Sequence, residues 1–212
     1  MYSLVIDCSH KENFLGLFKD NNAWLFERKF SGQPFEDLII NLKKALCEYG
    51  VDISEVSHFY TPDSPGSTLG IRVTQMMIKG FLKTCCRTSK VTYYNGLHLS
   101  ALLLLDEISE LNTANYLITE NGRHSWNVIK IDAKLKTQPV IHKYEHDALA
   151  ELEGDFFYIS QLKTWGPPKV TSKQSDYSPD RFLGCIEKLN SFEIDTSFLS
   201  PTKNTYVKWN QN

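Results

Sequence analysis

The order of the predicted elements is the feature of this sequence that most constrains its fold. Three β-rich segments open the chain, and polar turns separate them, at residues 3–6, 14–18 and 23–30. Helices and strands then alternate, with helices at 34–49, about 68–85 and 97–106 and strands at 56–61 and 90–93. A meander followed by alternating helices and strands indicates a mixed sheet in an α/β fold.

The second half follows a similar order in a shorter form. Strands are predicted at 116–119, 125–132, 139–144 and 156–160, with helices at 145–153 and 180–190, the last of them capped by Ser178. A proline-containing loop covers 164–179, and 206–209 form a short extended tail. The similar element order predicts duplicated α/β lobes, residues 1–105 as the N-terminal lobe and 106–212 as a smaller C-terminal lobe.

Two helices of the N-terminal half have distinctive apolar patterns. In the helix at 34–49, Leu38 and Leu42 belong to one apolar stripe, and Gly50 ends the helix. The helix at 68–85 is apolar nearly all round, and its apolar residues include Leu69, Val73, Met76 and Met77. A helix of this kind is buried on more than one side, so a partner is a candidate to cover the face that the core does not.

Composition and charge narrow the class of protein. The chain has 23 basic and 25 acidic residues, a formal net charge of −2, which gives no overall field for nucleic acid. The longest apolar run, Ala101 to Leu105, is far shorter than the ~20 residues that span a bilayer. No secretory signal follows Met1, and none of the five cysteines forms a Cys-x-x-Cys unit. We therefore expect a cytoplasmic protein with reduced thiols.

The strongest local motif is the segment from Asp63 to Val73. Pro65 and Gly66 make a sharp turn, Ser67 is placed to cap the next helix, and Gly70 allows another backbone to approach. A loop at a helix N-terminus can bind an anion, and Asp7, Ser9, Gly66 and Ser67 are the candidate residues of such a site. A plain strand-to-helix turn is the alternative, and Asp7 can equally accept hydrogen bonds from the backbone of its own turn.

These residues resemble the TsaB family, also called YeaZ. Members carry a strand, then Gly-Pro-Gly-Ser-Phe-Thr-Gly-Leu-Arg, then a helix, and this chain has Ser-Pro-Gly-Ser-Thr-Leu-Gly-Ile-Arg at 64–72. The opening Leu-Val-Ile-Asp-Cys-Ser at 4–9 is similar to the family's Leu-Ala-Ile-Asp-Thr-Ser. The motif resemblance covers about the first hundred residues. Ser64 replaces a family glycine, and Cys8 replaces a threonine, which marks the chain as a divergent relative.

The resemblance implies a fold and a role. The fold would be the two-lobed, ribonuclease H-like fold of the actin, sugar-kinase and Hsp-type ATPase class, with a shortened second lobe. The chain would be a non-catalytic scaffold that binds a TsaD-like catalytic subunit and works with a TsaE-like ATPase. That complex installs threonylcarbamoyladenosine (t6A) in tRNA, which the scaffold would contact only indirectly. No tightly bound cofactor or metal is implied; ATP or ADP at the subunit interface is left open.

The same resemblance assigns the partner interface to the two N-terminal helices. The candidate interface residues are Leu38, Leu42, Leu69, Val73, Met76 and Met77. If the partner is absent, the same apolar faces are expected to form a homodimer, because contiguous exposed apolar patches rarely stay unpaired.

Two other classes of function stay open. An enzyme of the same superfamily would hold a metal or ATP; His142 and His146 have the His-x-x-x-His spacing of TsaD relatives, although Tyr94 and His98 stand at the corresponding place. Two imidazoles with no third ligand make a poor zinc site. A stand-alone regulatory binding protein is the third hypothesis. Trp165, flanked by Lys163, Lys169 and Lys173, could stack on RNA, but a solvated loop is the commoner outcome.

Overall fold

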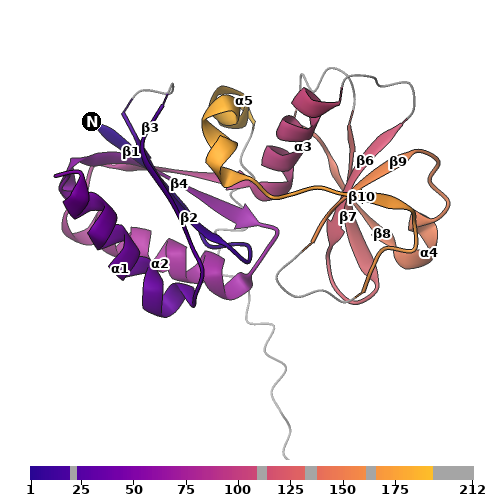
Figure 1. Cartoon of the computed structure of the whole chain (residues 1–212), viewed down its shortest axis with the longest axis horizontal. Helices are drawn as coiled ribbons and strands as arrows, with labels where there is room; N and C mark the ends of the chain where they lie inside the picture. Colours follow the sequence, from indigo (N-terminus) through magenta and orange to yellow (C-terminus); the bar gives the residue numbers. More distant parts are fainter. Residues whose placement is uncertain (20–22, 109–113, 132–137, 161–165, 193–212) are drawn as a thin grey trace, which may run out of the picture.

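Two five-stranded sheets make up the framework of the molecule (Figure 1). The computed structural model describes residues 1–19, 23–108, 114–131, 138–160 and 166–192. The first sheet, with the elements packed on it, is called the first lobe below, and the second sheet with its covering elements the second lobe. The predicted tail at 206–209 and residues 163–165, at the start of the predicted loop, lie outside the described residues.

The first sheet combines an antiparallel meander with two parallel strands. Its order is β3-β2-β1-β4-β5, with β1 parallel to β4 and β4 parallel to β5. The strands are β1 (Tyr2–Asp7), β2 (Asn13–Phe18), β3 (Trp24–Phe30), β4 (Val56–Ser64) and β5 (Lys90–Asn95). All five were predicted, with ends that differ by up to three residues.

Both faces of the first sheet are covered, which explains why β1 and β2 are apolar on both sides. Leu4 and Ile6 face α1 (Pro34–Glu48) and α2 (Thr68–Thr84), whereas Val5 faces the opposite side, as expected for side chains that alternate along a strand. The opposite face is covered by α3 (Gly96–Glu107), the 3-10 helix η2 (Pro179–Cys185) and α5 (Ile186–Ser191). A further 3-10 turn, η1 (Ile53–Glu55), precedes β4.

The second sheet has the same topology as the first. Its order is β8-β7-β6-β9-β10 when read from the meander edge, with the three meander strands antiparallel and β6, β9 and β10 parallel. Its strands are β6 (Asn115–Glu120), β7 (Ser125–Ile131), β8 (Ile141–Glu145), β9 (Asp155–Ile159) and β10 (Ser172–Gln174). The predicted duplication of α/β lobes is therefore confirmed at the level of strand order.

The second lobe is the shorter version. Its meander is linked to β9 by α4 (His146–Leu149), which has 4 residues where α1 has 15. The prediction of a shortened second lobe is confirmed. The predicted helix at 145–153 was too long, because after Leu149 the chain continues in tight turns in which each N–H bonds to the carbonyl three residues back.

Helix α3 lies between the two sheets and packs against both (Figure 1). Leu99, Leu102 and Leu103 face the first sheet, whereas Leu97, Ala101 and Leu104 face the second. This double burial explains why the helix is apolar all round, as expected for a helix without a solvent face. None of the described helices has the length and apolarity that a membrane crossing requires.

Two other predictions near the C-terminus were wrong. Ser172–Gln174 form β10, which lies inside the segment predicted as a loop, because they pair with β9. The helix predicted at 180–190 is η2 followed by α5, and the Ser178 side chain makes no cap hydrogen bond. Residues 179–192 pack on the first sheet although they follow the lobe boundary predicted at 105/106. The boundary itself stays a prediction.

Candidate functional site

The loop before α2 packs tightly against the turn after β1. Ser67 caps the helix, since its Oγ accepts a hydrogen bond from the Gly70 N–H at 3.1 Å, as predicted. A Cβ on Gly70 would lie 1.8 Å from the Cys8 carbonyl oxygen, and one on Gly66 would lie 2.4 Å from that of Ser9. The two glycines therefore permit a close approach of backbones, and the Ser67 N–H donates to the Ser9 carbonyl at 2.6 Å.

Asp7 is buried at the end of β1, and four donors from the chain satisfy its carboxylate. Its Oδ1 accepts from the Ser9 N–H at 2.9 Å and from the Ser9 hydroxyl at 2.6 Å. Its Oδ2 accepts from the hydroxyls of Tyr94 at 2.8 Å and Tyr177 at 2.5 Å. The bonds to Ser9 are those expected if Asp7 stabilises its own turn, the alternative to anion binding. Anion binding by Asp7, Ser9, Gly66 and Ser67 stays a prediction.

Asp7, Ser9, His10, Tyr94 and Tyr177 together are called the Asp7 cluster below. The sequence offered no pattern that would have identified His10 and the two tyrosines as members of it. The ring of His10 stacks on Tyr177 with 3.7 Å between centroids, and its Nδ1 lies 2.8 Å from Ser9 Oγ. Burial lowers the pKa of His10 to about 4, against the opposing charge of Asp7, so its imidazole is neutral at pH 7. Burial and Asp7 raise the pKa values of Tyr94 and Tyr177 well above 10, which keeps both hydroxyls protonated as donors.

The histidines considered as metal ligands do not converge. The Nε2 of His98 lies 2.9 Å from the Pro139 carbonyl oxygen, whereas Tyr94, four residues earlier, bonds to Asp7. His142 lies on β8, and His146 begins α4, where its Nδ1 accepts a hydrogen bond from the Trp126 indole at 2.7 Å. Within the described ranges, no group of three or more His, Cys, Asp or Glu residues could hold a metal ion.

An apolar groove of about 500 Å³ runs between α1 and α2. Of the predicted interface residues, Leu69 is 58% and Met76 66% exposed, and Val73 and Met77 are partly buried between groove and core. Leu38 and Leu42 are buried in the core, although Leu38 also lines the groove. Two further groove residues were not among the predicted interface residues, Phe35, which is 77% exposed, and Ile39. The apolar stripe of α1 that contains Leu38 and Leu42 therefore extends past the core into the groove.

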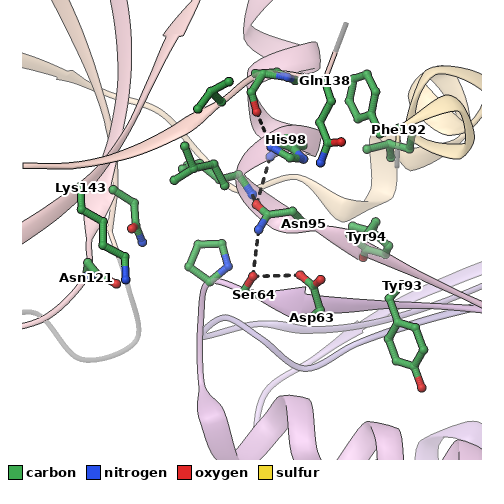
Figure 2. A pocket seen from close by; sticks show the side chains of 17 residues that line it. Asp63, Ser64, Tyr93, Tyr94, Asn95, His98, Asn121, Gln138, Lys143 and Phe192 are labelled. Carbon is green, nitrogen blue, oxygen red and sulfur yellow. Dashed lines mark hydrogen bonds between the residues drawn. The ribbon is translucent and has the colours of Figure 1, made fainter. Parts of the chain in front are cut away.

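A second cavity, of about 560 Å³, lies between the lobes (Figure 2). On the first-lobe side it is bordered by Asp63 and Ser64 at the end of β4, by Asn95 and by His98 of α3. Figure 2 shows Lys143 and Asn121 of the second lobe across the cavity from Ser64. Because the parallel strands β4 and β5 end here, the cavity has the position in which α/β sheets commonly bind ligands.

Similarity to known proteins was found for the structure but not for the sequence. No protein-family model matches the chain, and no curated protein matches its sequence. Among solved structures, the chain is similar to YeaZ from Pseudomonas aeruginosa, with a TM-score of 0.59 and 12% identity over 89% of this chain and 92% of that one. It is also similar to an uncharacterized protein with similarity to peptidase YeaZ from Pseudomonas aeruginosa, with a TM-score of 0.58 and 12% identity over 90% and 93%.

A third structure, an exopolyphosphatase from Cytophaga hutchinsonii, aligns with a TM-score of 0.41 and 13% identity over 76% of this chain and 67% of that one. At identities this low, the likeness to the two YeaZ-related structures establishes the fold and leaves function to be argued from the site. The chain therefore has the YeaZ-like, two-lobed α/β fold of the actin, sugar-kinase and Hsp-type ATPase class, with a shortened second lobe.

Proposed function

We propose that the chain is a non-catalytic, TsaB-like scaffold subunit that binds a TsaD-like partner through the α1–α2 groove. In this role it supports t6A modification of tRNA by that partner together with a TsaE-like ATPase, and touches tRNA only indirectly. Alone, the chain forms a homodimer through the same groove. An adenine nucleotide at the interface and a cytoplasmic location belong to the same proposal.

The exposed apolar groove is the observation that carries this proposal. Phe35, Ile39, Leu69 and Met76 lie on two adjacent helices and expose their side chains together. Water contact with such a patch is unfavourable, and patches of this kind mark interaction sites on soluble proteins. The resemblance to TsaB proteins implies that these two helices bind the partner. Met76 and Met77 also supply flexible side chains that adapt to an apolar surface.

Light scattering on the purified chain, alone and mixed with the TsaD-like protein of the same cell, tests this proposal. We expect a homodimer that is replaced by a heterodimer in the mixture. Met76→Glu places a carboxylate in the groove, and burying it unpaired costs enough to weaken either dimer by about 100-fold or more. The fold should be unaffected, because Met76 is 66% exposed.

Val140→Glu is the matched control, because Val140 is 65% exposed but lies at the interlobe cavity. This variant should keep the wild-type masses. An unchanged dimer mass for a folded Met76→Glu variant would show that the groove is not the interface. A wild-type monomer that ignores the TsaD-like protein would favour the regulatory or enzymatic alternatives instead.

A further inference from the structure

One face of the second sheet is directed toward the first lobe. On three neighbouring strands, β6, β7 and β8, its side chains change from apolar to polar at the same level. One row of paired residues is apolar and packs around α3; it consists of Leu117, Ile129 and Ile141. Two residues further on, toward the cavity, the paired row is Thr119, Asn127 and Lys143. Side chains two apart on a strand share a face, so both rows face the first lobe, one under α3 and the other at the interlobe cavity.

Asn127 is the most informative member of the polar row. It is only 9% exposed and lines the cavity, and its side chain makes no hydrogen bond with any residue that the structure describes. Its amide atoms are not among the polar atoms that the fold encloses completely, so they open onto the cavity. Buried polar side chains normally have a partner, because an amide loses its hydrogen bonds to water when it is buried. An amide that borders a cavity without such a partner points to a ligand, or to water in its place.

Lys143 lies next to Asn127 on the adjacent strand and also lines the cavity. It forms no ion pair within the described part of the chain. Asn121, in the turn after β6, adds a second amide on the same side, and its Nδ2 also donates to Ser125 Oγ at 3.4 Å (Figure 2). Asn121, Asn127 and Lys143 are named the donor strip here; together they offer one positive charge and two amide groups.

The rest of the cavity wall is suited to the body of an organic molecule. Leu97, Val140, Ile141 and Phe192 give it apolar surface, and a volume of about 560 Å³ is within the usual range for a small-molecule site. Among the described lining residues the only carboxylate is Asp63, which belongs to the opposite wall. The charge distribution therefore directs a negative group toward the donor strip.

We propose that the donor strip binds the anionic group, a carboxylate or a phosphate, of a small organic molecule whose apolar part fills the interlobe cavity. Lys143 supplies the charge, and the amides of Asn121 and Asn127 supply hydrogen bonds that fix its orientation. The body of the molecule lies against Leu97, Val140 and Phe192. This site is separate from the α1–α2 groove and from the Asp7 cluster, so it does not depend on the scaffold function.

Ligand-observed NMR on the full chain tests this site with three probes of similar shape, benzoate, phenyl phosphate and benzamide. We expect at least one of the two anions to bind and neutral benzamide to bind about tenfold more weakly. Added salt should weaken the binding of the anion. Lys143→Ala reduces the affinity for the anion by about tenfold, the effect of one charge-assisted hydrogen bond at a solvent-accessible position. Binding of only one of the two anions identifies the ligand as a carboxylate or as a phosphate ester.

Lys130→Ala is the matched control, because Lys130 is an exposed lysine of β7 that is not part of the cavity wall. It should leave all three affinities unchanged. Asn121→Asp, at an exposed turn, places a negative charge in the donor strip without disturbing the core, and it should abolish anion binding. The proposal is overturned if neither anion binds at millimolar concentration, if benzamide binds equally well, or if folded Lys143→Ala and Asn121→Asp variants bind as the wild type does.

Discussion

Gly70 is the position at which the first turn of α2 contacts the turn that follows β1. The first turn of α2 lies so close to the turn after β1 that any side chain at this position would overlap the Cys8 carbonyl. The backbone of β1 cannot move away, because it is paired on both sides, with β2 and with β4. The requirement for glycine here is therefore one of space.

Gly70→Ala should lower the free energy of unfolding by about 3 kcal/mol, because the new Cβ would lie 1.8 Å from a backbone oxygen. Urea denaturation of the purified variant measures this. Gly80→Ala is the control in the same helix, since a Cβ there would have no heavy atom within 4 Å. That variant should be about 0.5–1 kcal/mol more stable than the wild type, as expected for alanine replacing an exposed helical glycine. Equal effects at both positions would contradict the close approach.

At the level of elements, the sequence predicted most helices and strands correctly where the pattern was long and periodic. The helices α1, α2 and α3 were identified from apolar spacing and from caps such as Ser67. β10 was missed because Ser172–Gln174 are polar and too short to show alternation, so only pairing with β9 makes them a strand. The exposure of Phe35 was also not predictable, because periodicity shows that a helix has an apolar face but not what covers it.

Helix α3 carries one titratable residue between the two sheets, and this makes stability depend on pH. Burial lowers the pKa of His98 from 6.5 to about 4, although the hydrogen bond to Pro139 opposes the shift. In the unfolded chain the imidazole of His98 is therefore protonated below about pH 6.5, whereas in the folded chain it is protonated only below about pH 4. Stability should fall as the pH is lowered through this window, and His10 adds to the same trend.

Urea midpoints at about pH 7 and about pH 5.5 check this, a range above the titration of ordinary carboxylates. His98→Gln keeps an amide donor for the Pro139 carbonyl but does not titrate, so the loss of stability between the two values should become smaller. His142→Gln, at an exposed position on β8, should keep the wild-type loss. The same loss in all three proteins would show that His98 is protonated without penalty.

For the whole molecule, the Asp7 cluster joins segments that are far apart along the chain. Asp7, Tyr94 and Tyr177 come from the first strand, the last strand of the first sheet and the segment after β10. No local pattern could have predicted this contact, since the two bonded residues are 170 positions apart. The two-lobed fold was predictable from element order, whereas the residues that tie its lobes together were not.

Tyr177→Phe removes one donor from the buried carboxylate and should cost about 1.5–3 kcal/mol of stability, as for a hydrogen bond to a charged group. Amide hydrogen exchange should also become faster in residues 172–192, because this contact holds the returning segment on Asp7. Tyr49→Phe, at an exposed tyrosine at the end of α1, is the control and should be neutral. Unchanged stability and exchange in Tyr177→Phe would mean that the other three donors suffice.

The return of residues 179–192 to the first sheet also bears on how the protein is made. On the ribosome, the strands of the first sheet and α3 emerge early, but the side chains that complete the cover of one face of the sheet are among the last described residues to be synthesised; they are Phe182, Ile186 and Leu189. At about 5–20 residues per second, the part of that apolar face that these side chains cover stays exposed for roughly 5 to 20 s. Folding of the first lobe is therefore completed only after residues 182–189 have been translated, and a nascent chain stalled in the second sheet would carry an open apolar surface.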